Sequence, residues 1–520
     1  MNAFLIRYRG LLLASAFLSL FLWRLPLHTQ DGPNHTLVAV TLARLADSPA
    51  ESAVYRSHLG PFQTNTLFPL LYRPASAVLS AAAYEKAFMA VSLVLLLIAY
   101  RVFLSVWSPR SGGLWVLGLP LVFHPLFITG MYNYLASVPL TLIALALMRR
   151  GVETRRWQYF IGFLACSWII LLAHPFPFFV LPIALAVLAA TKRETRGPVM
   201  RYYGPVTLVF LVLGFLLPLL TASAGVSSEY TFKALPGLLG GLLVYNAVGY
   251  SVLHLVLTAP FFLMLLGLMV YSGTRCRWQD GAFWMVLLLG YFVFPNEGSG
   301  GAHLNERFLP FAWCVIPIGM VLHGARLRVV QVVSVTTALI MGAGVLVGMR
   351  RIDATVESAQ EVLGVLPGGS RLYPVNFDPM GPALTYSSLM HLWAVYDHDK
   401  TVYSPYLFAY MDLMPLSRRE PASTTYFPAT AENFPEQIAT NRICRPTDAV
   451  EATDCDLRRS EGFREILRHA EFYDYWFVHR PPAAFVSMMR SLPGVALVVE
   501  RGESSLWSNE DARPFLPALQ

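Results

Sequence analysis

The chain has 520 residues, of which 55% are hydrophobic and only 14% are charged, and its formal net charge is +7. Ordinary soluble domains contain about 25% charged residues, so this composition excludes a typical soluble globular protein. Apolar runs of roughly 17–23 residues recur along the chain, which is the length an α-helix needs to cross a hydrocarbon core about 30 Å thick. The sequence therefore predicts a polytopic α-helical membrane protein.

About eleven transmembrane helices are predicted. The first helix has no small-residue cleavage site after Trp23, so we expect it to be retained rather than removed as a signal peptide. A short, Gly-rich apolar segment at 234–249 is interpreted as an interfacial or re-entrant piece rather than a span. The predicted spans are 5–23, 84–106, 114–130, 131–148, 157–173, 176–191, 203–222, 251–272, 281–295, 307–323 and 328–349.

Basic residues are concentrated in alternate short loops. The loop at 149–156 holds four arginines, whereas "TGMYNY" and "HPFPF" hold no basic residue. This asymmetry predicts a cytoplasmic N-terminus, and it explains most of the positive charge without a nucleic-acid partner. The predicted domains are a transmembrane catalytic domain, 1–350, which includes an outer loop at 24–83, and an extracytoplasmic α/β domain, 351–520.

The C-terminal region combines strand-like and helix-like segments. "EFYDYWFVHR" predicts a buried strand, "PPAAFVSMMRSL" a helix beginning at proline, and "GVALVVER" a second strand. Cys444 and Cys455 also lie in this region. They could form one disulfide in an oxidising compartment or remain two free thiols, and the sequence favours neither.

The stretch "QDGPNH" places Asp31 just beyond the first predicted span. Pro33 suits the first turn of a helix, and "PNHTLVAVTLARLAD" predicts an amphipathic helix along the membrane surface. Asp31 could simply cap that helix. However, Pro33 at the first helical position would make Gly32 the cap and leave Asp31 free. We therefore expect the Asp31 carboxylate to have a functional role rather than a capping role.

Further polar residues are predicted at the same membrane face, where ionisable groups are functional candidates. Arg307 begins a span beside a Gly-rich loop, which suits an anionic head group. Glu85 and Lys86 could instead form a structural ion pair. His174 could cap a helix or form a hydrogen bond within the helical bundle, which is the more common fate of a lone histidine. The candidate binding residues are Lys86, Asn34, Tyr132, Asn133, His174, Glu297, His303, Glu306 and Arg307.

This layout resembles the GT-C glycosyltransferases, membrane-embedded enzymes that use polyprenyl-phosphate-linked sugars. The resemblance rests on the acid of "QDGPNH", the helix after it, about eleven spans and an outer C-terminal α/β domain. In addition, "NERFLPF" is similar to the Arg-containing stretch that these enzymes place near the lipid phosphate. The acid pair common in the family's first loop is not evident, because Asp31 has His35 as its neighbour.

The resemblance implies transfer of a hexose or pentose from a polyprenyl-phosphate donor to a hydroxyl of a glycan, lipid or protein, with inversion expected. Asp31 would be the base, with His35 orienting it or sharing the proton, and Arg307 with Lys86 would stabilise the phosphate. The site would face outward from the cytoplasmic membrane. No cofactor is implied with certainty, and a divalent metal remains open. The alternatives are a transporter or flippase of a lipid-linked saccharide, or a non-catalytic membrane component of a polysaccharide assembly complex.

Overall fold

The computed structural model describes 2–123, 125–191, 193–216, 230–244, 252–275, 278–296, 303–378, 381, 388–396, 398–404, 407, 414–419 and 472–512. Glu297, and Cys444 and Cys455 with the disulfide considered between them, lie outside these residues. The chain divides into two compact units. The first consists of Met1–Leu27, Gly60–Phe68 and Ala83–Val347, and the second of His28–Leu59, Pro69–Ala82 and Gly348–Gln520.

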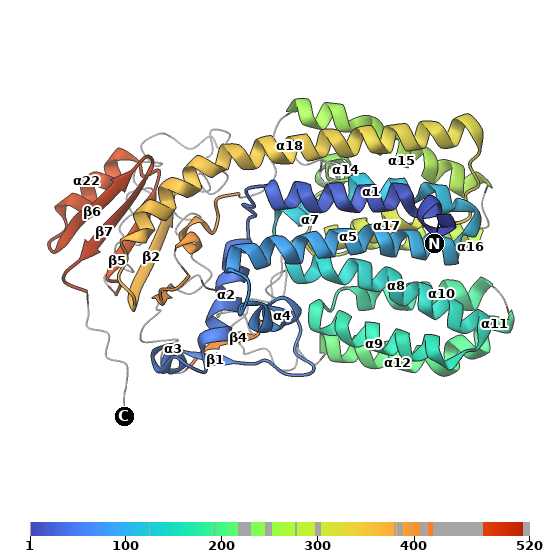
Figure 1. Cartoon of the computed structure of the whole chain (residues 1–520), viewed down its shortest axis with the longest axis horizontal. Helices are drawn as coiled ribbons and strands as arrows, with labels where there is room; N and C mark the ends of the chain where they lie inside the picture. Colours follow the sequence, from blue (N-terminus) through green and yellow to red (C-terminus); the bar gives the residue numbers. More distant parts are fainter. Residues whose placement is uncertain are drawn as a thin grey trace. The chain divides into compact units, whose positions relative to one another are not determined.

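The first unit is helical (Figure 1). Its predicted span at 157–173 is a single helix over the same residues, and several other helices begin within a few residues of their predicted starts. The main helices are α1 (Asn2–Arg24), α5 (Ala81–Trp107), α8 (Tyr132–Thr154), α9 (Trp157–Ala173), α10 (Pro177–Thr191), α12 (Gly204–Leu211), α14 (Leu235–Val244), α15 (Val252–Arg275), α16 (Trp278–Val293), α17 (Leu309–Val315) and α18 (Gly324–Gly364).

Several of these helices are long and apolar enough to cross a membrane, and the apolar helices indicate a membrane protein. Apolar side chains on α15 face outward, as with Val270, which is 68% exposed. The number of about eleven spans stays a prediction. Among the described residues, four helices meet both criteria, at Ala81–Trp107, Tyr132–Thr154, Val252–Tyr271 and Gly324–Gly364, and shorter apolar helices lie at Trp157–Ala173, Pro177–Ala190 and Gly281–Val293.

In the part of the chain that the structure describes, the predicted spans at 114–130 and 307–323 are not continuous α-helices. The segment at 114–130 consists of a 3-10 helix (η1, Pro109–Leu117) and two four-residue α-helices, α6 (Gly118–Leu121) and α7 (Pro125–Ile128). Its glycines and prolines disfavour a regular helix, because glycine is flexible and proline lacks a donor N–H. The segment at 307–323 forms a short 3-10 helix and then α17, which ends at Val315.

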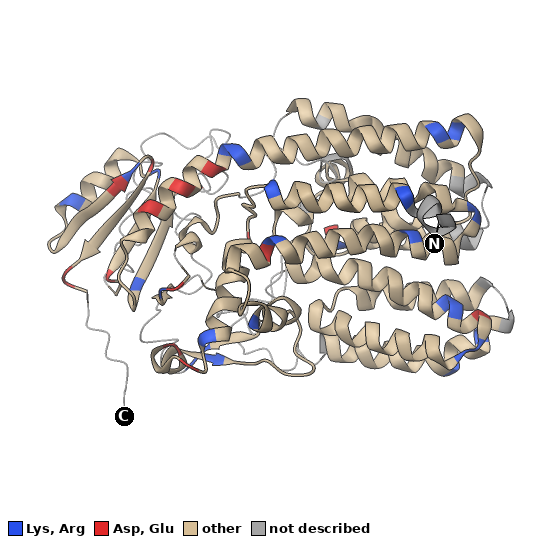
Figure 2. Cartoon of the chain, in the orientation of Figure 1, with Lys and Arg blue, Asp and Glu red and all other residues tan. Residues whose placement is uncertain are grey.

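Most basic residues of the helical unit lie towards the end at which the chain's N-terminus is marked (Figure 2). This gathering agrees with the alternation of basic loops in the sequence. The side of the membrane that this end faces stays a prediction.

The second unit contains a five-stranded mixed sheet with the order β3-β2-β5-β7-β6. Strand β2 pairs in parallel with β3 and β5, whereas β7 pairs antiparallel with β5 and β6. The predicted strand–helix–strand segment is present as β5, α22 and β6. The strands and helix are β2 (Ser370–Asn376), β3 (Val402–Tyr403), β5 (Tyr475–His479), α22 (Ala483–Ser491), β6 (Val495–Arg501) and β7 (Ser504–Asn509).

Segments of the predicted outer loop complete the second unit. Helix α2 (Gly32–Arg44) forms where the sequence predicts one, but all seven residues from Thr36 to Leu42 are buried. A helix buried all round differs from the amphipathic surface helix that the sequence indicated. The remaining elements are α3 (Pro49–Val54), α4 (Leu67–Ala75) and the antiparallel pair β1 (Tyr55–Ser57) and β4 (Leu416–Arg418).

Candidate functional site

Arg307 lies in the 3-10 turn η4 (Glu306–Phe308), directly before α17, and its side chain is almost fully buried. One guanidinium nitrogen, Nη1, lies 2.8 Å from His174 Nε2, and Nη2 lies 3.8 Å from the sulfur of Met131. The guanidinium carbon lies 5.7 Å from the centre of the Tyr134 ring. The Tyr134 hydroxyl donates to the Arg307 carbonyl at 2.6 Å. The arginine is therefore fixed by a histidine, an aromatic ring and its own backbone.

The two ring nitrogens of His174 contact different groups, Arg307 at Nε2 and the Phe176 backbone at Nδ1. Its Nδ1 accepts the Phe176 N–H at 3.1 Å, and its ring meets Tyr134 edge-on at a centroid distance of 5.4 Å. A neutral imidazole whose Nδ1 accepts a hydrogen bond carries its proton on Nε2. Arg307 Nη1 also can only donate. The 2.8 Å contact between the two nitrogens is therefore a hydrogen bond from Arg307 only in the other His174 tautomer. An anionic oxygen that lay beside both nitrogens would accept from each of them when His174 carries its proton on Nε2.

Glu306 is buried beside Arg307 but takes its partners elsewhere. One carboxylate oxygen accepts from Lys233 Nζ, and the other lies 2.8 Å from His303 Nδ1. Burial alone would raise the pKa of Glu306, but the hydrogen bonds and charges of His303 and Lys233 outweigh it and lower the pKa. His303 has a positive φ of 57°, uncommon for a residue other than glycine. Glu306 is therefore an ionised carboxylate whose oxygens contact Lys233 and His303. The Arg307 guanidinium contacts His174 instead.

Tyr132 and Asn133, at the start of α8, have structural partners. The Tyr132 hydroxyl donates to Glu85 Oε1. Asn133 accepts the Phe68 N–H at 2.8 Å and donates to the Asn65 carbonyl at 3.0 Å. Both polar atoms of the Asn133 amide thus hold the backbone of 65–68 in place. Lys86, also predicted as a phosphate ligand, is half-buried in the second turn of α5.

In the second unit, Asp31 takes the N-cap position of α2, one residue earlier than predicted, but its carboxylate makes no capping hydrogen bond. The Gly32 N–H instead donates to Thr29 Oγ1 at 3.1 Å. Asp31 Oδ1 lies 3.5 Å from His391 Nε2. A capping hydrogen bond therefore does not explain why an Asp is at position 31. A catalytic role for its carboxylate stays a prediction.

His391 is the residue that sequence reasoning missed. It lies 357 positions beyond Asn34, whose amide nitrogen is 3.4 Å from His391 Nδ1, and both side chains are buried. If the Asn34 amide donates to Nδ1, the imidazole proton sits on Nε2, facing Asp31. Asn34, His391 and Asp31 therefore form one polar cluster in the second unit. No sequence motif marks this partnership.

His35, predicted to assist Asp31, has a different character. Burial lowers its pKa from 6.5 to about 4; Asp31 opposes this effect and His391 adds to it. Such a histidine is neutral at pH 7 and holds a proton weakly, so the structure does not support proton sharing with Asp31. Within the described ranges, no group of three or more His, Cys, Asp or Glu side chains is placed to hold a metal ion.

No protein-family model and no curated protein match the chain. Solved structures do match it. ArnT from Cupriavidus metallidurans bound to undecaprenyl phosphate aligns with a TM-score of 0.54 and 11% identity, over 97% of this chain and 99% of that one. The apo state of ArnT aligns with a TM-score of 0.53 and 12% identity, over 98% of this chain and 100% of that one. The chain therefore has the fold of ArnT, and its resemblance to the GT-C glycosyltransferases is confirmed at the level of the fold.

Proposed function

We propose that this chain is a glycosyltransferase. It would move a sugar from a polyprenyl-phosphate-linked donor to an acceptor hydroxyl at the outer face of the cytoplasmic membrane. The fold supports this proposal, because it matches ArnT along nearly the whole chain and one of the ArnT structures holds undecaprenyl phosphate. A shared fold does not establish a shared function, so the proposal depends on the chemistry of the candidate site residues.

The observation that carries it is the pair of donors at Arg307 and His174, whose facing nitrogens lie 2.8 Å apart. A phosphate oxygen that lay beside both nitrogens would accept from both when His174 carries its proton on Nε2, and charge-assisted bonds of this kind are strong. Glu306, the nearest acid in the sequence, is held by Lys233 and His303. Glu306 therefore directs its two carboxylate oxygens to Lys233 and His303 rather than to the Arg307 guanidinium. Lys86 stays a candidate for a second contact with the same phosphate.

The reaction assigns a separate task to Asp31. The acceptor hydroxyl oxygen forms a bond to the anomeric carbon of the sugar while the bond from that carbon to the phosphate oxygen breaks. The hydroxyl proton passes to Asp31, and polyprenyl phosphate leaves with the bonding electron pair. His391 Nε2–H would hold Asp31 Oδ1, at their distance of 3.5 Å, and leave the other oxygen for the acceptor. Arg307 and His174 would stabilise the charge that develops on the leaving phosphate.

Attack on the face opposite the phosphate predicts inversion at the anomeric carbon. The proposal includes a hexose or a pentose as the sugar and a cell-envelope glycan, lipid or protein as the acceptor. In a cell with a periplasm, the reaction would take place on that side of the membrane.

A reconstitution experiment separates this proposal from transport. The purified chain in liposomes would be given undecaprenyl-phosphate-linked sugars, one at a time, with a cell-envelope extract as acceptor. We expect free undecaprenyl phosphate and a sugar-modified acceptor to accumulate together. If the lipid-linked sugar changes leaflet while its sugar–phosphate bond stays intact, the chain is a flippase and the proposal is wrong. If neither occurs with any donor, a non-catalytic role stands instead.

A further inference from the structure

A large apolar groove in the first unit has one charged residue in its wall. It lies between α15 and the first turns of α18 and has a volume of about 690 Å³. Its lining on the α18 side includes Ala325, Arg326, Val329 and Val330. These positions recur at helical spacing and so share one face of the helix. Gly267 and Tyr271 belong to the α15 wall.

Helices α15 and α18 are in contact near His254 and are farther apart near Gly267, and the groove lies where they are farther apart. His254 Nε2 lies 3.0 Å from the Ile340 carbonyl, and a side chain added at Gly344 would collide with the His254 ring. At the other level, a Cβ added at Gly267 would have no atom within 4 Å. The space between the helices is therefore open towards the groove.

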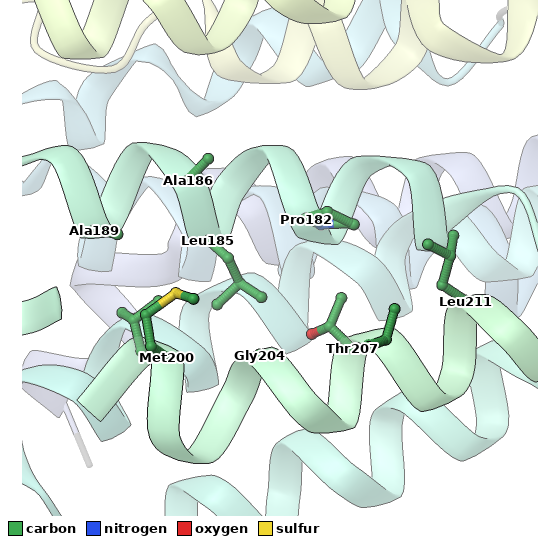
Figure 3. A pocket seen from close by; sticks show the side chains of 10 residues that line it. Pro182, Leu185, Ala186, Ala189, Met200, Gly204, Thr207 and Leu211 are labelled. Carbon is green, nitrogen blue, oxygen red and sulfur yellow. The ribbon is translucent and has the colours of Figure 1, made fainter. Parts of the chain in front are cut away.

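A second groove shows what Arg326 adds. It lies between α10 and α12, has a volume of about 260 Å³, and is lined by residues such as Leu185, Met200 and Thr207 (Figure 3). No charged side chain is among the residues that line it. An acyl chain of any lipid would suit such a surface. The α15–α18 groove has the same apolar wall together with an exposed arginine.

We propose that the α15–α18 groove binds one anionic phospholipid, with an acyl chain along the apolar wall and the phosphate at Arg326. Basic pockets between transmembrane helices on the cytoplasmic side are suited to anionic head groups. The loop that holds Arg326 and Arg328 belongs to the basic set that the sequence predicts on that side. This site is independent of the proposed transfer reaction, because it uses neither Asp31 nor Arg307.

Native mass spectrometry of the purified full chain tests the proposal. The protein would be incubated with equal amounts of dioleoyl phosphatidylglycerol and dioleoyl phosphatidylcholine. We expect the wild type to retain one phosphatidylglycerol in preference to phosphatidylcholine. Arg326→Gln should reduce that preference about fivefold, the effect of one basic residue near a lipid surface. Arg326→Lys should keep most of it.

Arg328→Gln is the matched control. Arg328 has the same charge on the same helix, but it lies two positions from Arg326, so it faces away and does not line the groove. We expect it to keep the preference for phosphatidylglycerol. Equal losses for Arg326→Gln and Arg328→Gln would overturn the proposal in favour of general surface charge.

Gly267→Leu tests the groove itself, because its added side chain enters open space. We expect this variant to lose the retained phospholipid. Full retention would overturn the proposal, since the head group alone would then account for binding. A wild-type dimer that Gly267→Leu dissociates would assign the groove to a second copy of the chain. Displacement of phosphatidylglycerol by undecaprenyl phosphate in this assay would assign it to the polyprenyl lipid.

Discussion

Arg307 and Asp31 are held in opposite ways. Arg307 faces another donor, His174, at 2.8 Å, and the carboxylate beside it in the sequence is occupied by Lys233 and His303. Asp31 lies 3.5 Å from His391, which Asn34 approaches from its other side. The first arrangement places a guanidinium beside a histidine nitrogen, and the second places a carboxylate beside a histidine that also contacts an amide. The difference suits Arg307 to phosphate binding and Asp31 to proton acceptance.

Asp31→Asn should have the largest effect. Asparagine keeps the size of the side chain and its capping ability, but it cannot take the proton from the acceptor hydroxyl. The rate of sugar transfer should therefore fall by roughly 10²–10⁴. The measurement is the rate of sugar transfer with the natural donor, and an unchanged melting temperature would show that the variant is folded. Full activity in Asp31→Asn would show that the carboxylate is not the base.

Arg307→Ala should weaken donor binding by roughly 10- to 100-fold, the usual cost of losing a hydrogen bond to a charged group. Because the charge would act on both the bound donor and the leaving phosphate, KM should rise and kcat should fall. Arg307→Lys should recover only part of the loss, since an ammonium lacks the planar fork. Binding of undecaprenyl phosphate and transfer kinetics would be measured together. Unchanged binding in Arg307→Ala would contradict the role in phosphate recognition.

His391→Asn should reduce kcat about tenfold with little change in KM, because it removes the donor that orients Asp31. His35→Asn is the matched control, and it should have the smaller effect. If His35→Asn proved the more damaging, the assignment of the orienting role to His391 would be reversed.

A smaller effect is expected on the stability of the second unit. Burial lowers the pKa of His479 from 6.5 to about 4, and its Nδ1 is 3.0 Å from Ser504 Oγ. Between these pKa values the unfolded chain binds more protons than the folded one, so stability falls as the pH is lowered. We expect a loss of about 1 kcal/mol from pH 6.5 to 5.5 at this residue.

Thermal melting across this pH range would measure the loss. His479→Gln should flatten the dependence on pH, whereas Ser504→Ala should lower the melting temperature but keep the dependence. An unchanged slope in His479→Gln would show that folding does not lower the pKa of this histidine. The same test on His35, whose pKa is also lowered to about 4, would show whether this histidine too stays neutral.

The sequence predicted Arg307 and Asp31 because each is a charged residue at the edge of an apolar run, where ionisation is costly. It did not predict Lys233 as the partner of Glu306, or that Asn133 would hold the backbone of 65–68. Lys233 lies 73 positions from Glu306. No periodicity connects residues so far apart, since side-chain patterns report only on neighbours along one helix or strand.

By itself, the sequence determined where several helices begin, because hydrophobic length and proline placement act within a single segment. α9 at 157–173 follows directly from such a run. Only the tertiary structure decided that α2 is buried all round, that 114–130 is broken, and that His391 meets Asp31. The reason is that burial and polar pairing depend on which segments pack together, and packing joins residues that the chain keeps hundreds of positions apart.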